Sequence, residues 1–183
     1  MKRICLPLLL CCCLLLTGCG EDRKLKKQYE DFSAALAARE SLELSAALQA
    51  EYEDRSADFR LACQIGPEEA VVTVREPAII AGVSATVRPD GSCLACNGII
   101  LDTGPLDAYG LSPLTALPAL ADMLKNGHLD SCWQADGQPV LRLVRDDHLS
   151  AEVRFDPAFQ RPLYAELFSD GRVTVCCTIE EWK

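Results

Sequence analysis

Residues 169–179 read Ser169-Asp170-Gly171-Arg172-Val173-Thr174-Val175-Cys176-Cys177-Thr178-Ile179, and this stretch shows most clearly which fold class the chain adopts. From Val173 to Ile179 every second side chain is apolar, which is the period of a strand with one buried and one wet face. The Asp-Gly pair before the run is typical of a tight hairpin, because both central residues of a type I′ turn need a positive φ. The stretch therefore predicts a strand that follows a hairpin in an antiparallel sheet.

The same alternation of apolar and polar residues recurs along the chain. It occurs in residues 59–65, 83–88 and 149–156, and further Asp-Gly turns lie at residues 88–91 and 135–138. Together these patterns predict a mostly antiparallel sheet.

Two segments show the helical period instead. Residues 21–38 place Leu25, Tyr29, Phe32 and Leu36 at spacings of four, three and four, which predicts an N-terminal helix packed on the core. Residues 112–127 predict a second helix that is capped by a serine and interrupted at Pro118, as two short pieces or with a kink. The fold class that follows is α+β, with one domain over residues 22–183.

The first nineteen residues carry a targeting signal. Met1-Lys2-Arg3 is a basic start, and the apolar run from Ile4 to Leu16 is shorter than the roughly 20 residues of a membrane span. Leu16-Thr17-Gly18-Cys19 resembles the lipobox of bacterial lipoproteins. The resemblance implies a signal peptide over residues 1–18, a lipidated N-terminus at residues 19–21, and a covalent diacylglycerol and acyl lipid on Cys19. The alternative is an ordinary cleaved signal with a chance cysteine.

Charge and motif content exclude several classes of function. The formal net charge is -9 and aromatic residues make up 6% of the chain, so it lacks the basic surface of a nucleic-acid-binding protein. Its two histidines, His128 and His148, have neither metal-ligand nor triad spacing, and no nucleophile motif occurs. We therefore expect neither enzymatic activity nor a cofactor or metal.

The order of elements resembles the LolA/LolB-like lipoprotein-carrier fold, and more closely the LolA-like lipoproteins of spore-forming bacteria that include the germination lipoprotein GerS. The resemblance implies a strongly curved antiparallel sheet, an incomplete barrel, around an apolar cavity that a mid-chain helical lid closes. The residues that carry it are Asp58-Phe59, residues 76–83, Asp90-Gly91, residues 110–113, Leu117-Pro118, residues 161–163 and residues 170–173.

Six side chains are the candidates for lining that cavity or its lid. The helical leucines have to cover the sheet, and strand alternation places Trp133 on the same face as Leu129 and Ala135, in the core or the cavity. The candidates are Leu114, Leu117, Leu120, Leu124, Trp133 and Phe155.

These patterns together predict a binding protein at a membrane surface. The chain is expected to be held by its lipid anchor on the extracytoplasmic face of the cell membrane. There it would act as a scaffold or chaperone for an exported partner such as a cell-wall hydrolase. A carrier of lipid or acyl chains is the competing hypothesis.

Cysteines offer a third hypothesis, a thiol-redox or metal protein. Cys93 and Cys96 have the C-x₂-C spacing, but alternation on a strand places residues three apart on opposite faces. Unpaired thiols and one or two structural disulfides both remain open. The remaining cysteines after Cys19 are Cys63, Cys132, Cys176 and Cys177.

Overall fold

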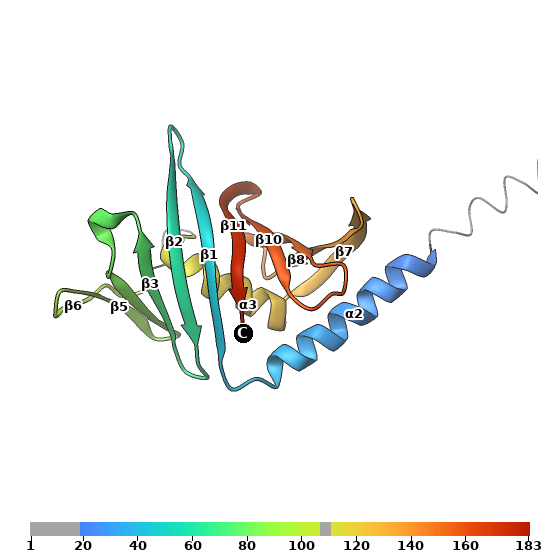
Figure 1. Cartoon of the computed structure of the whole chain (residues 1–183), viewed down its shortest axis with the longest axis horizontal. Coiled ribbons are helices and arrows are strands. Elements are labelled where there is room, and N and C mark those ends of the chain that lie inside the picture. Colours follow the sequence, from blue (N-terminus) through green and yellow to red (C-terminus); the bar gives the residue numbers. More distant parts are fainter. Residues whose placement is uncertain (1–18, 107–110) are drawn as a thin grey trace, which may run out of the picture.

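One antiparallel sheet carries most of the chain (Figure 1). The structure is a computed structural model that describes residues 19–106 and 111–183, so the predicted signal peptide lies outside the described residues. Within them, eleven strands follow the spatial order β6-β5-β4-β3-β2-β1-β11-β10-β9-β8-β7. Their bounds are β1 Leu42–Glu51, β2 Ser56–Ile65, β3 Ala70–Glu76, β4 Ser84–Arg88, β5 Gly91–Cys96, β6 Ile99–Asp102, β7 His128–Ala135, β8 Gln138–Val144, β9 Leu149–Phe155, β10 Pro162–Ser169 and β11 Arg172–Trp182.

The chain builds this sheet in two halves that meet in its middle. From β1 it moves outward, strand by strand, to β6 at one edge. Helix α3 (Pro113–Asn126) then crosses to β7 at the opposite edge, and the chain returns inward to β11. There β11 pairs with β1, with Ala46 opposite Ile179 and Leu48 opposite Cys177. The sheet is curved and open, with β6 and β7 as its edges, which confirms the predicted α+β class and incomplete barrel.

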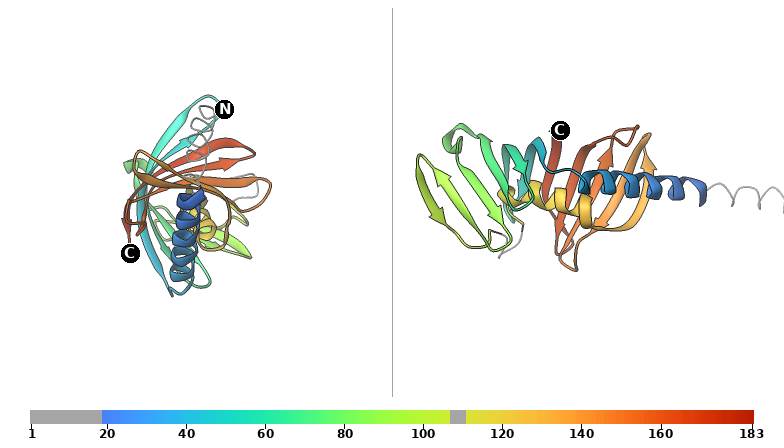
Figure 2. Two further views of the ribbon diagram at one scale, coloured as in Figure 1. Left: turned by 90° about the vertical axis from the view of Figure 1, so that its right-hand side faces the viewer. Right: turned by 90° about the horizontal axis from the view of Figure 1, so that it is seen from below.

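Both long helices lie on one face of this sheet, here called the inner face (Figure 2). Helix α2 (Cys19–Ala37) buries Leu25, Tyr29 and Leu36, as its apolar period predicts. Two of its hydroxyls hold the end of α3, because Tyr29 Oη donates to the carbonyl of Gly127 at 3.0 Å and Ser33 Oγ to that of Lys125 at 2.8 Å. The predicted N-terminal helix is therefore confirmed. A three-residue 3₁₀ helix, η1 (Ala78–Ile80), leads from β3 toward β4.

Helix α3 is one helix of 14 residues and not the two pieces that Pro118 suggested. A capping box opens it, in which the backbone N–H of Thr115 donates to Ser112 Oγ at 3.3 Å and that of Ser112 to Thr115 Oγ1 at 3.0 Å. Eight of its side chains are buried, so packing on the sheet outweighs the one backbone hydrogen bond that a proline removes.

Type I′ geometry occurs at two predicted hairpins and at a third that the sequence analysis did not single out. Asp136-Gly137 and Asp170-Gly171 both have positive φ, and so do Asn97-Gly98 between β5 and β6. The turn at Pro89-Asp90 differs from these, because the proline ring holds φ negative.

An aromatic cluster joins α2 to the ends of β9 and β11. Phe155 is fully buried, stacks on Phe159 at 4.3 Å between ring centroids, and meets Phe32 of α2 edge-on at 5.0 Å. Trp182, near the C-terminus, stacks on Phe32 at 6.3 Å. These rings fill the space between helix and sheet.

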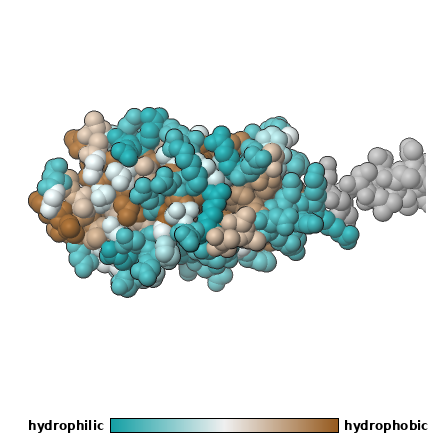
Figure 3. All heavy atoms as spheres, turned by 60° about the horizontal axis from the view of Figure 1, so that its bottom comes forward, coloured by the Kyte–Doolittle hydropathy of each residue, from teal (hydrophilic) through white to brown (hydrophobic). Residues whose placement is uncertain are grey.

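Exposed hydrophobic side chains gather at the end of the molecule that is farthest from the start of α2 (Figure 3). The edge strand β6 exposes 64% of Ile99, 71% of Ile100 and 59% of Leu101. Ile79 of η1 is 91% exposed. This end is the most apolar exposed part of the described chain.

Candidate binding cleft

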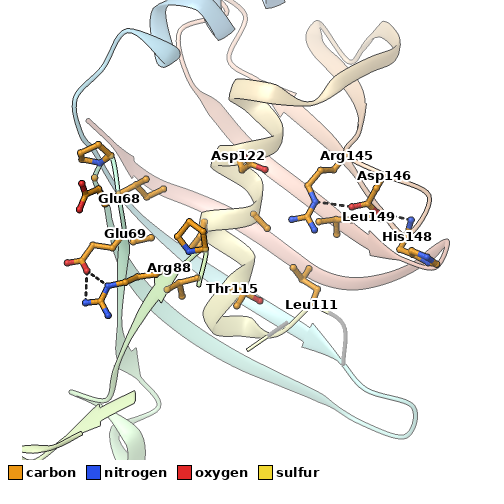
Figure 4. A pocket seen from close by; sticks show the side chains of 18 of the residues that line it. Glu68, Glu69, Arg88, Leu111, Thr115, Asp122, Arg145, Asp146, His148 and Leu149 are labelled. Carbon is orange, nitrogen blue, oxygen red and sulfur yellow. Dashed lines mark hydrogen bonds and ion pairs between the residues drawn. The ribbon is translucent and has the colours of Figure 1, made fainter. Parts of the chain in front are cut away.

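A cleft of about 510 Å³ opens between α3 and both halves of the sheet (Figure 4). Its walls come from the β2–β3 turn and the end of β4 on one side, and from the β8–β9 turn on the other. Helix α3 runs between them. We refer to this hollow as the α3 cleft.

The spacing of residues on α3 explains how one helix serves two surfaces. Thr115, Pro118, Ala119 and Asp122 follow the i, i+3, i+4, i+7 pattern of one helical face, and all four line the cleft. Leu117, Leu120 and Leu124 point instead into the core, where each is fully buried.

Small and apolar side chains form the floor of the α3 cleft. Ala70, Ala119 and Leu149 are buried there, and Val87 and Leu111 are partly buried and packed against the core. The floor therefore offers a water-poor surface for apolar groups of a ligand.

Charged side chains form the rim, and both arginines are engaged. Arg88 pairs with Glu69 at 2.8 Å, and that hydrogen bond raises the pKa of Arg88. Arg145 pairs with Asp146 at 3.0 Å. The pKa of Asp146 is lowered, first because its carboxylate accepts the backbone N–H of His148 at 2.9 Å and then because of Arg145.

His148 ties the β8–β9 turn to the β10–β11 turn. Its Nδ1 lies 2.6 Å from Asp170 Oδ1, and its carbonyl accepts the backbone N–H of Asp170 at 2.8 Å. The hydrogen bond to the Asp170 carboxylate raises the pKa of His148. The wall of the cleft is thus held by side-chain and backbone contacts.

A second hollow continues the α3 cleft past the β2–β3 turn toward the end of α2. It measures about 480 Å³ and shares Ile65, Gly66, Pro67, Pro118 and Asp122 with the first. Together the two hollows form an elongated surface along one side of α3.

The candidate residues from the sequence lie in the core more than in the cleft. Leu117, Leu120, Leu124 and Phe155 are fully buried and Leu114 is partly buried, and none of the five lines the α3 cleft. The helix they belong to does line it, through its other face.

Trp133 lies on the opposite face from the one predicted. A β-bulge between Leu129 and Ser131 shifts the register of β7, so Cys132 pairs with Leu141 and Trp133 with Val140. Trp133 is consequently 36% exposed and lies outside the core. Strict alternation failed here because the bulge inserts one residue.

Cys93 and Cys96 are both free thiols on β5. Their places three residues apart on a regular strand put them on opposite faces. The other four described cysteines after Cys19 are free as well. Cys132 Sγ lies 3.6 Å from the carbonyl of Asp22 in α2, and burial raises the pKa of this thiol.

Cys19 is the first residue of α2. No helix among residues 19–106 and 111–183 is long and apolar enough to span a membrane. The same described residues contain no group of three or more potential metal ligands.

Sequence reasoning missed the rim of the cleft. Neither the four carboxylates of Glu68, Glu69, Asp122 and Asp146 nor the guanidinium group of Arg88 belongs to a motif that the sequence shows. The available signal was weak, because these residues come from two turns, the end of β4 and α3, and only the topology brings them together.

An open, curved antiparallel sheet with two helices on its inner face (Figure 2) defines a half-barrel fold class. The particular fold is LolA-like, as predicted. No protein-family model and no curated protein sequence matches this chain.

Two solved structures of this fold superpose with TM-scores above 0.5. A LolA superfamily protein from Nitrosomonas europaea is 14% identical, with a TM-score of 0.52 over 86% of this chain and 92% of its own. A putative outer membrane lipoprotein-sorting protein domain from Vibrio parahaemolyticus is 10% identical, with a TM-score of 0.51 over 89% and 92%. At these identities the likeness establishes the fold.

Proposed function

We propose that this protein is an exported, lipid-anchored binding protein, which holds a segment of an exported partner protein in the α3 cleft. The anchor is the lipid on Cys19, and the site of action is the extracytoplasmic face of the membrane. A cell-wall hydrolase is one such partner.

The observation that carries the proposal is where the free space lies. Under α3 the sheet is filled by leucines and under α2 by Phe155, whereas beside α3 a cleft with an apolar floor and a charged rim is open. Its volume of about 510 Å³ is within the roughly 300–1,000 Å³ of ordinary ligand sites. A polypeptide segment offers both apolar side chains for such a floor and polar groups for such a rim.

The predicted lipid anchor favours a binding protein that stays at the membrane over a carrier that moves its cargo away. Helix α2 begins at Cys19 itself, so the domain follows the predicted anchor without a linker. Two acyl chains give stable membrane attachment, and an attached domain gains effective concentration at the membrane but does not carry cargo away.

The anchor is tested by labelling with a clickable palmitate analogue in cells. Cys19→Ala is expected to abolish labelling and release the protein from membranes. Cys13→Ala, which leaves the lipobox intact, serves as the matched control and keeps both. Persistent labelling of Cys19→Ala would refute the anchor.

The binding site is tested by purifying the anchored protein in mild detergent and identifying what copurifies. Pro67 is exposed in the β2–β3 turn and lines both hollows, so Pro67→Trp places a large ring in the cleft at little cost to folding. We expect it to lose the partner protein. Asp54→Trp in the exposed β1–β2 turn is the control, and loss of the partner there too would contradict a role for the cleft.

A carrier of acyl chains is the second candidate, and the LolA-like fold favours it. Displacement of α3 would expose the apolar inner face of the sheet to a lipid. Mass spectrometry of the same preparation separates the two proposals, since one bound lipid per chain without any partner protein would favour the carrier.

Binding without catalysis is part of the proposal. The rival is thiol-redox chemistry at Cys93 and Cys96. Replacement of both by serine should leave partner binding unchanged, whereas loss of a disulfide-exchange activity in a folded variant would favour the rival.

A further inference from the structure

The charge on the rim of the α3 cleft is unbalanced. Four carboxylates line it, those of Glu68, Glu69, Asp122 and Asp146, against the two guanidinium groups of Arg88 and Arg145 and the imidazole of His148, which pairs with Asp170 outside the cleft. Each arginine pairs with a neighbouring carboxylate. Among the described residues, neither Glu68 nor Asp122 forms an ion pair.

These two carboxylates without an ion pair lie where the two hollows join, and the charged residues Arg39, Glu40 and Lys125 line the second hollow. Asp122 lines both hollows, and its only described side-chain partner is the neutral amide of Asn126 at 2.8 Å. Glu68 stands on the facing wall, beside Pro67, which also lines both (Figure 4). A segment lying along α3 would pass both residues.

A ligand that covers the cleft also removes water from these carboxylates. Desolvation without a compensating charge is unfavourable, so an anionic or neutral ligand loses binding energy there, whereas a cation recovers it. A metal ion does not fit, because no group of three or more potential ligands exists in the described chain. A phosphate-bearing headgroup would meet two carboxylates without an ion pair here, and both arginines of the α3 cleft are already paired.

We propose that the segment held in the α3 cleft is a basic, apolar polypeptide, with a lysine or arginine placed between Glu68 and Asp122. This inference rests on the proposed function and names the chemistry of the partner. The apolar residues of the segment meet Ala119, Leu149 and Ala70, and its cation compensates the two free carboxylates. The anionic character of the rim thereby selects among exported proteins.

The test uses a phage-displayed random dodecapeptide library and the full-length lipidated protein in phosphatidylcholine nanodiscs. Captured peptides are expected to be enriched in lysine and arginine over the input library. Glu68→Gln with Asp122→Asn keeps the shape of both side chains and should abolish that enrichment. It should also weaken binding of the best peptide about tenfold, an effect that 500 mM salt reduces.

A matched control variant completes the test, and different outcomes overturn this inference and the proposed function. Glu53→Gln with Asp54→Asn makes the same chemical change in the exposed β1–β2 turn and should change nothing. Peptides that bind the wild type but not Pro67→Trp depend on the cleft. If they show no preference for basic residues, or bind the cleft double variant equally well, this inference alone is overturned. Absence of any cleft-dependent peptide would overturn the proposed function and this inference with it.

Discussion

Phe155 connects the sheet to the N-terminal helix through its aromatic contacts. The ring is fully buried and touches Phe159 and Phe32, so its removal leaves a cavity that the neighbouring rings cannot fill without moving. We expect Phe155→Ala to lower the free energy of unfolding by about 3–5 kcal/mol in urea titrations. Ile79→Ala, at a 91% exposed side chain, should cost less than about 0.5 kcal/mol. A loss below about 1 kcal/mol for Phe155→Ala would mean that the cluster is loosely packed.

Burial divides the thiols into reactive and inert ones. Burial raises the pKa of Cys63 from 9.0 to about 12, and it raises that of the buried Cys177 as well. Because the thiolate is the reactive form, Cys63 at pH 8 carries roughly a thousandfold less of it than an unperturbed thiol.

Thiol titration with a disulfide reagent at pH 8 should therefore show Cys96, which is exposed, reacting first. Cys63 and Cys177 should react only after urea is added. Cys96→Ser should remove the fast phase and leave the urea-dependent one. In native buffer, Cys63→Ser should react with the same stoichiometry as the wild type, because Cys63 does not react there. Reaction of all six described thiols without urea would contradict the burial.

The face of the sheet on which a side chain lies could be predicted only where the strand is regular. The period of two placed Cys177 in the core correctly. It failed at Trp133 because the bulge in β7 depends on pairing with β8 and leaves no local mark in the sequence.

At the scale of elements, the start of α3 depends on Ser112. Its hydroxyl accepts the backbone N–H of Thr115, which would otherwise lack a partner at the helix end. Ser112→Ala should cost about 1 kcal/mol of stability, and Ser112→Asp, which retains an acceptor, should cost much less. Thermal unfolding measures both, and equal losses in the two variants would contradict the capping role.

The edge strand β6 carries three exposed aliphatic side chains, and no strand among residues 19–106 and 111–183 pairs with its outer edge. Such an edge is prone to pair with other chains. We expect Ile100→Lys to leave the circular dichroism spectrum unchanged and to raise the concentration at which the protein remains monodisperse in light scattering. Glu51→Lys, at the exposed end of β1, changes charge by more and should help less if the apolar edge is responsible.

The elements that the sequence predicts well are those with strong local signals. The stripe of α2, the serine cap of α3 and the Asp-Gly hairpins each depend on neighbours in the chain. Strand β1 was not singled out, because alanine and leucine dominate its buried positions and neither favours a strand. The α3 cleft could not be predicted, since its rim gathers Glu68, Arg88 and Asp146 from two turns and a strand end that lie far apart in the sequence.

At the scale of the whole molecule, the ladder between β1 and β11 joins the two halves. Its buried side also forms the middle of the core, where Ala46 of β1 lies between Leu61 of β2 and Ile179 of β11. Helix α3 crosses both halves as well. Neither half therefore has a separate core, and we expect the sheet to unfold as one unit.

Urea unfolding tests this expectation with two probes. Tryptophan fluorescence reports on Trp133 and Trp182, which both belong to the C-terminal half, whereas far-ultraviolet circular dichroism reports on all strands. The two transitions should coincide. Ala46→Asp places an unpaired carboxylate in the core and should shift both urea midpoints down together. The free energy of unfolding should fall by more than about 3 kcal/mol. Ala47→Asp makes the same change on the outer face, opposite Arg60, and should cost less than about 1 kcal/mol. A circular dichroism transition in two steps, with fluorescence following only one, would show that the halves fold independently in spite of the shared ladder.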